Sequence, residues 1–234
     1  MNAVTAPAGE DVSAEDLLRD KLAEYRGRIV LVSSFGAESA VVLHMVAAID
    51  SATAVIFIDT GKLFAETLQY RDELVLRLGL RDLRIARPAV ALLQSVDPHG
   101  TLWQSDPDLC CWQRKVEPLD EALAGFDAWI TGRKRHQGGL RRNLPVVESG
   151  PDGRVKINPL AGWSGQDIAE YFAAHGLPRH PLAARGYASI GCTTCTRAVR
   201  PGEPARAGRW DGFDKSECGI HLPRVAQLRG EARP

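Results

Sequence analysis

The chain has 234 residues, of which 44% are hydrophobic and 25% charged, a composition that suits one folded domain with a buried core and excludes wholesale disorder. Its 29 basic and 29 acidic residues balance, which argues against a nucleic-acid-binding protein, because affinity for the phosphate backbone needs a basic excess. The first residues show no secretory signal, and the most apolar run, at 40–49, is too short to span a bilayer. We therefore expect a cytoplasmic protein with no nucleic-acid or membrane partner.

Apolar strands and helical segments alternate along most of the chain. Ser13 opens the first helix with a capping box, and Ser164 opens another before a helix at 165–175. This alternation predicts an α/β fold in which a twisted parallel sheet has helices on both faces. The predicted strands lie at 28–33, 54–58, 82–86 and 128–131, and the other predicted helices at 13–25, 40–49, 62–78, 88–95 and 115–124.

The remaining segments are less regular. Residues 1–12 form a loose leader rich in Ala, Pro and Gly. Residues 146–159 predict a hairpin at the sheet edge, because Pro-Asp-Gly stands at the centre. From about residue 178 the periodicity fades and Gly, Pro, Arg and Cys become frequent. We expect that part to be irregular and held by ligands rather than by a core.

Two loops follow predicted strands at the carboxyl edge of the sheet, where open α/β sheets bind ligands. Glycine and small hydroxyl residues before a helix can present backbone N–H groups to an anion, although an ordinary strand-to-helix turn would have the same composition. The first loop resembles a modified form of the Ser-Gly-Gly-x-Asp-Ser loop of the adenine nucleotide α-hydrolase superfamily, and the second resembles that superfamily's second nucleotide loop. The candidate binding residues in them are Ser33, Ser34, Phe35, Gly36 and Asp59.

Four of the five cysteines form two pairs. Cys110 and Cys111 are adjacent, and Cys192 and Cys195 form a C-x-x-C motif that by itself also fits a zinc half-site or a redox disulfide. Adjacent cysteines reach a single zinc ion only with backbone strain, whereas each corner of an iron–sulfur cube takes a separate thiolate. The four residues therefore favour a 4Fe–4S cluster over zinc.

The fifth cysteine, Cys218, lies near the C-terminus among polar residues. A free cysteine is often a small buried hydrophobe, but Lys215 and Glu217 do not form a core segment. A thiol of ordinary pKa, about 8.5, is mostly protonated at neutral pH, and nearby cations such as Lys215 would raise its thiolate fraction. Cys218 is therefore a candidate nucleophile.

Four motifs together resemble the assimilatory adenosine 5′-phosphosulfate (APS) reductases, over about residues 29 to 221. They are CCWQRKVEPL from Cys110, IGCTTCTR from Ile190, GRW from Gly208 and ECGIH from Glu217. The resemblance implies reduction of APS to sulfite and AMP in sulfate assimilation. The Cys218 thiolate attacks the sulfuryl sulfur to form an S-sulfocysteine, from which thioredoxin or a similar thiol donor releases sulfite. The cluster organises the site and carries no electrons.

The resemblance also implies a division of the chain and a set of cations for the phosphosulfate. Residues 13–200 form the nucleotide- and cluster-binding domain, and residues 201–234 form a catalytic tail that closes over substrate. His221 helps to position the substrate or the tail, although a histidine there could also simply pack. The implied cationic ligands, each of which could alone be a surface charge, are Lys115, Arg133, Arg135, Arg142, Arg206 and Arg209.

Three other functions stay open. A reductase for 3′-phosphoadenosine 5′-phosphosulfate (PAPS) would use the same chemistry, but such reductases typically lack the paired cysteines. An ATP-dependent tRNA thiolase with a cluster would need an intact nucleotide loop and a basic face. A non-catalytic cluster-binding sensor would not need Cys218. A homo-oligomer is compatible with the sequence.

Overall fold

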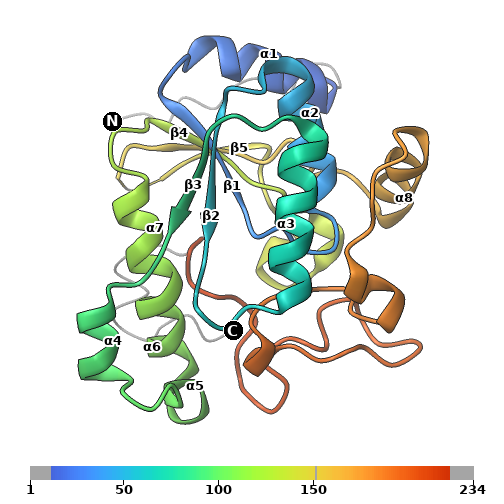
Figure 1. The fold of residues 1–234 in the computed structure, drawn as a ribbon. Coiled ribbons are helices and arrows are strands. Elements are labelled where there is room, and N and C mark those ends of the chain that lie inside the picture. Colours follow the sequence, from blue (N-terminus) through green and yellow to red (C-terminus); the bar gives the residue numbers. More distant parts are fainter. Residues whose placement is uncertain (1–11, 151, 222–234) are drawn as a thin grey trace.

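The computed structural model describes residues 12–150 and 152–221. A six-stranded sheet lies at its centre, in the order β3-β2-β1-β4-β6-β5 (Figure 1). The β5–β6 hairpin at the edge is antiparallel and the other strand pairs are parallel, as predicted. The strands are β1 (Ile29–Ser33), β2 (Ala54–Ile58), β3 (Leu83–Ala86), β4 (Ala128–Ile130), β5 (Val147–Ser149) and β6 (Val155–Ile157).

The helices begin where the capping residues predict. The Ser13 hydroxyl accepts the Asp16 N–H at 3.0 Å, and Ser164 forms a reciprocal capping box with Asp167. No helix in the described part of the chain is long and apolar enough to cross a membrane. The α-helices are α1 (Ala14–Glu24), α2 (Ser39–Asp50), α3 (Ala65–Leu78), α4 (Val90–Val96), α5 (Leu102–Ser105), α6 (Pro107–Cys111), α7 (Glu117–Ala122) and α8 (Gly165–Ala174).

Two helices differ from the prediction, and in the first a distant contact overrides the local pattern. The helix expected at 62–78 begins only at Ala65, since Leu63 forms a β-bridge with Cys192 and the Lys62 carbonyl accepts the Thr193 N–H at 2.8 Å. The helix expected at 115–124 ends at Ala122 and follows α6 through a π-helical turn, Trp112–Val116. Such turns widen a helix locally and often occur at functional sites.

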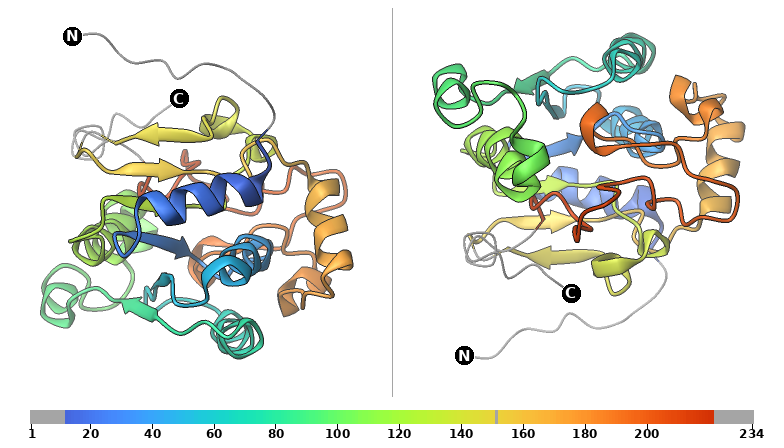
Figure 2. Two further views of the ribbon diagram at one scale, coloured as in Figure 1. Left: turned by 90° about the horizontal axis from the view of Figure 1, so that it is seen from above. Right: turned by 90° about the horizontal axis from the view of Figure 1, so that it is seen from below.

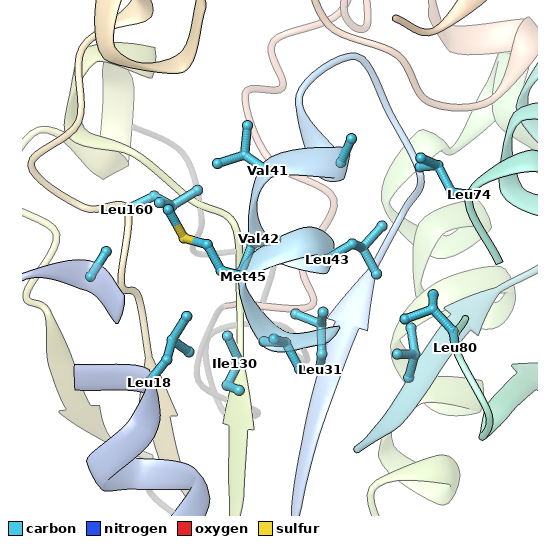
Figure 3. Close-up of a cluster of buried hydrophobic side chains, with 14 of the residues drawn as sticks. Leu18, Leu31, Val41, Val42, Leu43, Met45, Leu74, Leu80, Ile130 and Leu160 are labelled. Atoms are coloured by element: carbon cyan, nitrogen blue, oxygen red, sulfur yellow. The ribbon is translucent and has the colours of Figure 1, made fainter. Parts of the chain in front are cut away.

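The core lies on both faces of the sheet. On one face, residues of α1, α2, α3 and α8 pack against Leu31 and Ile130, which are fully buried (Figure 3). On the other face, α7 packs Leu119 against Val30 and Trp129. A strand buried on both faces is apolar along its length, which explains the continuous Ile-Val-Leu-Val run of β1.

The chain after α8 runs across the lower part of the molecule in Figure 1, drawn in orange to red. Apart from short 3₁₀ turns, Pro181–Arg185 and Thr193–Cys195, its described part is irregular, as predicted. We call residues 201–221 the tail; Figure 2 shows it from below, in the middle of the molecule. Most of the predicted leader (residues 1–11) and the last part of the predicted tail (222–234) lie outside the described residues.

Candidate functional site

A cavity lies where the carboxyl ends of β1, β2 and β4 meet the tail. The parallel strands bring their following loops to one edge, and the tail lines the opposite wall. Residues far apart in sequence therefore face a common space. The predicted site residues that line it are Ser33, Ser34, Gly36, Lys115, Arg133, Arg206, Arg209, Cys218 and His221.

The loop after β1 is held in a tight local conformation. The Ser33 hydroxyl accepts the Phe35 N–H at 3.2 Å, and the Ser39 hydroxyl accepts the Gly36 N–H at 2.9 Å. Phe35 has a φ of 48° and turns its ring away from the cavity onto Phe57. A side chain at Gly36 would meet the Ile190 carbonyl at 3.5 Å. The N–H groups of Phe35 and Gly36 are thus bonded within the loop, Ser34 and Gly36 line the cavity, and Phe35 serves as an apolar anchor.

In the loop after β2, Thr60 rather than Asp59 lines the cavity. Asp59 accepts the Gly61 N–H at 3.1 Å and pairs with Arg87 at 3.1 Å. Thr60 is buried, with its Oγ1 3.3 Å from the Sγ of Cys192. This loop therefore connects the cavity wall to Cys192.

The basic loop after β4 supplies several cavity cations, each held by an acceptor. Arg133 pairs with Glu148, and the buried Lys134 ammonium lies 2.9 Å from Glu38. Burial lowers the pKa of both cations, and the paired carboxylates of Glu148 and Glu38 offset only part of this shift. These two ion pairs also tie the loop to Glu148 and to Glu38.

The four paired cysteines do not themselves line the cavity, but Thr60, which does, lies beside Cys192. Cys110, Cys111 and Cys192 are buried, Cys195 is half-buried, and all are free thiols. Cys110 is close enough to Cys192 and Cys195 for their charges to influence its pKa, which burial raises. No group of three His, Cys, Asp or Glu residues in the described ranges is arranged to hold a single metal ion. The donors thus gather from two distant segments without the geometry of a one-metal site.

Lys115 connects these cysteines to Cys218. It follows Cys111 in the π-helical turn and is half-buried. Burial opposes its charge, but the charges of Cys192, Cys111 and Cys218 outweigh burial and raise the pKa of the ammonium. A cation remains favourable in the buried site because several thiol sulfurs surround it.

The tail contributes Cys218 together with aromatic and cationic groups. Arg209 lies over the Trp210 ring at 4.5 Å, and Lys215 lies over it at 5.5 Å. Cys218 is half-buried and lines the cavity. His221 stacks on Trp129 at 5.4 Å, and burial holds its pKa well below the usual value. The imidazole is therefore neutral in this arrangement.

Two of the predicted cations do not reach the cavity wall. Arg135 donates its Nε to the Leu144 carbonyl at 2.8 Å, and Arg142 is exposed. Arg141, adjacent to Arg142, lines the cavity instead. The sequence analysis did not select Arg141, Thr60 or Trp210 as site residues. A run of basic residues does not reveal that Arg141, rather than its neighbour, points into the cavity. For Trp210, the GRW motif was the signal that could have identified it.

The chain is similar in sequence to known proteins. The phosphoadenosine phosphosulfate reductase domain family matches residues 28–198. The chain is 53% identical to an adenosine 5′-phosphosulfate reductase of Mesorhizobium japonicum over 210 residues, which are 90% of this chain and 80% of that protein. It is 42% identical to a protein of the same name from Streptomyces coelicolor, with 91% and 89% covered.

The chain is also similar to solved structures. The phosphate complex of phosphoadenylyl-sulfate (PAPS) reductase from Candida auris matches with a TM-score of 0.69 and 28% identity, over 80% of this chain and 91% of that chain. An FMN adenylyltransferase of Candida glabrata matches with a TM-score of 0.56 and 16% identity, over 97% and 86%. The second likeness shows a shared fold alone.

Proposed function

The chain belongs to the phosphoadenosine phosphosulfate reductase domain family, and from that premise we propose that it reduces APS to sulfite and AMP in sulfate assimilation. The observation that carries the proposal is Cys218, a thiol set apart from the four paired cysteines, in a cavity lined with cations. Relatives named for APS reduction at 53% and 42% identity support the choice of substrate.

The first step is an attack by the Cys218 thiolate on the sulfuryl sulfur of APS. An S–S bond forms, the bond from sulfur to the bridging phosphate oxygen breaks, and AMP leaves with that electron pair. Thiolate and APS bring three negative charges together, and the S-sulfocysteine and AMP carry the same three away. Cations must offset the repulsion, and Lys115, Arg206 and Arg209 line the cavity for that purpose.

The second step needs a thiol donor, for which we propose thioredoxin or a similar cytoplasmic protein. A donor thiolate attacks the Cys218 sulfur, and sulfite leaves as a dianion. A second donor thiol then resolves the mixed disulfide, so that the donor is oxidised and Cys218 returns to a thiolate. Residues 201–234 would act as a catalytic tail beside the binding domain at 13–200. The tail would have to move, because the Cys218 sulfur faces the cavity in the first step and must be accessible to the donor in the second.

We further propose that Cys110, Cys111, Cys192 and Cys195 hold a 4Fe–4S cluster. The residues fit this group in type: four thiols come from two segments, Cys110 is close enough to Cys192 and Cys195 for their charges to affect its pKa, and the Lys115 ammonium is close enough to Cys192 and Cys111 for the same effect. Four separate thiolates suit the corners of a cube, because each iron takes its own cysteine. When bound, the cluster would supply structural ties and local electrostatics, while Lys115 links its ligands to the nucleophile.

The nucleotide would lie against the loops after β1, β2 and β4. Ser33, Ser34 and Gly36 would contact it through hydroxyl and backbone groups, and Arg133 and His221 would border it. Phe35 would act through the backbone turn, and Asp59 by supporting its loop. Arg135 and Arg142 remain candidates only for surface contacts.

A PAPS reductase is the second candidate, because the Candida auris structure carries that name. The paired cysteines favour APS. Steady-state comparison of the two substrates would decide, since a strong preference for the 3′-phosphorylated one would exclude APS as the physiological substrate.

The proposal is tested by mixing the purified protein with APS alone and measuring the intact mass. We expect a sulfonate adduct that peptide mapping places on Cys218, and no adduct in the Cys218→Ser variant. An adduct on another cysteine, or none in the wild type, would contradict the proposed mechanism.

A further inference from the structure

Glu217, the residue before Cys218, carries a carboxylate that two arginines hold. Its oxygens accept hydrogen bonds from Nε and Nη2 of Arg141 at 2.6 and 2.8 Å. Nη2 of Arg206 lies 3.4 Å from the same carboxylate. The side chains of Arg141 and Glu217 are only 12% and 9% exposed. Such a bidentate pair of hydrogen bonds fixes the orientation of the carboxylate as well as its position.

The charge on Glu217 is maintained despite its burial. Burial raises the pKa of the carboxyl group, but the hydrogen bonds and charge of Arg141, together with Arg206, outweigh burial and bring the pKa below its usual value. The carboxylate is therefore ionised at neutral pH, and the pair with Arg141 is a lasting feature of the docked tail.

The contacts on either side of Cys218 show what this pair positions. The carbonyl of Ser216 accepts a hydrogen bond from Nη2 of Arg206 at 2.7 Å. After the thiol, Gly219 has a φ of +93°, and a Cβ there would stand 3.2 Å from Val116. His221 then stacks on Trp129 with an angle of 7° between the rings. The nucleophile thus lies between a polar anchor and an aromatic anchor.

Arg141 connects this anchor to the fixed part of the molecule. It ends the 3₁₀ turn Gly139–Arg141 in the loop that follows β4, and it also bonds Gln137 of that loop. A carboxylate in the tail is therefore tied to a loop that starts at a central strand of the sheet.

We propose that Glu217 is a positioning residue for the first chemical step: its ion pair with Arg141 holds the Cys218 sulfur at the cavity, and breaking that pair frees the sulfur for the thiol donor. This inference rests on the proposed function. A displacement of about 1 Å in a reacting group can cost about 10²-fold in rate, so a contact one residue away from the sulfur is well placed to control it.

The test compares Glu217→Gln, which keeps the shape and removes the charge, with Glu217→Asp, which keeps the charge on a shorter side chain. Glu66→Gln is the matched control, because Glu66 pairs with Arg185 at 2.8 Å on the surface, away from the cavity. Single-turnover mixing with APS gives the rate of sulfonate formation, steady-state assays give KM, and alkylation without substrate, followed by peptide mass analysis, gives the accessibility of Cys218.

We expect Glu217→Gln to slow adduct formation by about 10²-fold, to leave KM unchanged and to make Cys218 alkylate faster. Glu217→Asp should lie between this variant and the wild type, and Glu66→Gln should match the wild type. Adding Arg141→Gln to Glu217→Gln should not accelerate alkylation further, because both changes break one interaction.

Three results would overturn the inference: adduct formation at the wild-type rate in Glu217→Gln, unchanged accessibility of Cys218, or a lower KM with an unchanged rate. The last result would mean that the carboxylate merely competes with the substrate for arginines. A wild-type protein that forms no adduct would instead contradict the proposed function, and the alkylation rates would still report on docking.

Discussion

The central sheet and the tail are held by different interactions. Leu31 in β1 and Ile130 in β4 are fully buried among apolar side chains of the helices on one face of the sheet. The tail instead docks through charged and aromatic contacts, such as Glu217 with Arg141 and His221 with Trp129. Apolar burial in the sheet is lost only when the domain unfolds, whereas the few tail contacts can open locally. We therefore expect the tail, with Cys218, to open more readily than the sheet.

The largest expected effect is the loss of turnover, without loss of stability, when Cys218 in the tail is replaced. Cys218→Ser should abolish turnover, because a serine hydroxyl is a far weaker nucleophile at neutral pH than a thiolate. Its unfolding midpoint and visible absorption should match the wild type. Residual turnover above that of a blank, measured as sulfite release, would show that another group attacks the substrate.

Cys192→Ser should produce the opposite pattern. Loss of one of the four proposed ligands should remove the brown absorption of the cluster and lower the unfolding midpoint, because bound metal centres stabilise the fold that binds them. Iron analysis and visible spectroscopy measure this. Full iron content in Cys192→Ser would contradict its assignment as a ligand.

A substitution in the core should affect the sheet and not the tail specifically. Leu31→Ala removes a fully buried side chain and should reduce the free energy of unfolding by about 2–5 kcal/mol, because a cavity remains. Chemical denaturation gives the value. The alkylation rate of Cys218 in dilute buffer should stay close to that of the wild type; a large increase would mean that tail and core open together.

Two arginines that differ in placement should differ in effect. Arg209→Ala removes a cavity cation that lies over Trp210, and we expect kcat/KM to fall by about 10- to 100-fold, the value of a charge-assisted hydrogen bond of roughly 1.5–3 kcal/mol. Arg142→Ala changes an exposed residue and should leave kcat/KM unchanged. An equal fall in kcat/KM in both variants would show that Arg142 contacts the bound substrate.

The smallest expected effect is a pH dependence of tail docking. Burial, and then the surrounding cations, lower the pKa of docked His221, while in the free tail its pKa should be near the ordinary 6.5. The docked state thus binds fewer protons, so its stability is complete above about pH 6.5 and declines as the pH falls below that value. The cations that face His221 are Arg133, Arg141, Lys156 and Arg206.

We expect protection of Cys218 from alkylation to weaken by about tenfold between pH 7.5 and 5.5, after correction for its thiolate fraction with a free peptide. His221→Asn should remove this dependence. Constant protection over that range would show that protonation of His221 does not destabilise the docked tail.

Much of the fold could be predicted because it depends on local pattern. The β-branched runs predicted β1 and β2, and the serine caps predicted the starts of α1 and α8. The start of α3 could not be predicted, because Leu63 pairs with Cys192, far away in the sequence. Periodicity in one segment contains no information about such a partner.

The sequence by itself determined the residue types on which the proposed chemistry depends: two cysteine pairs, one separate cysteine near the C-terminus, and cations after a strand and in the tail. Only the tertiary structure decided that Arg141 faces the cavity while Arg142 faces solvent, and that Glu217 docks on Arg141. The physical reason is that a side chain's direction depends on backbone turns and on partners from other segments, which become neighbours only when the sheet and the tail pack together.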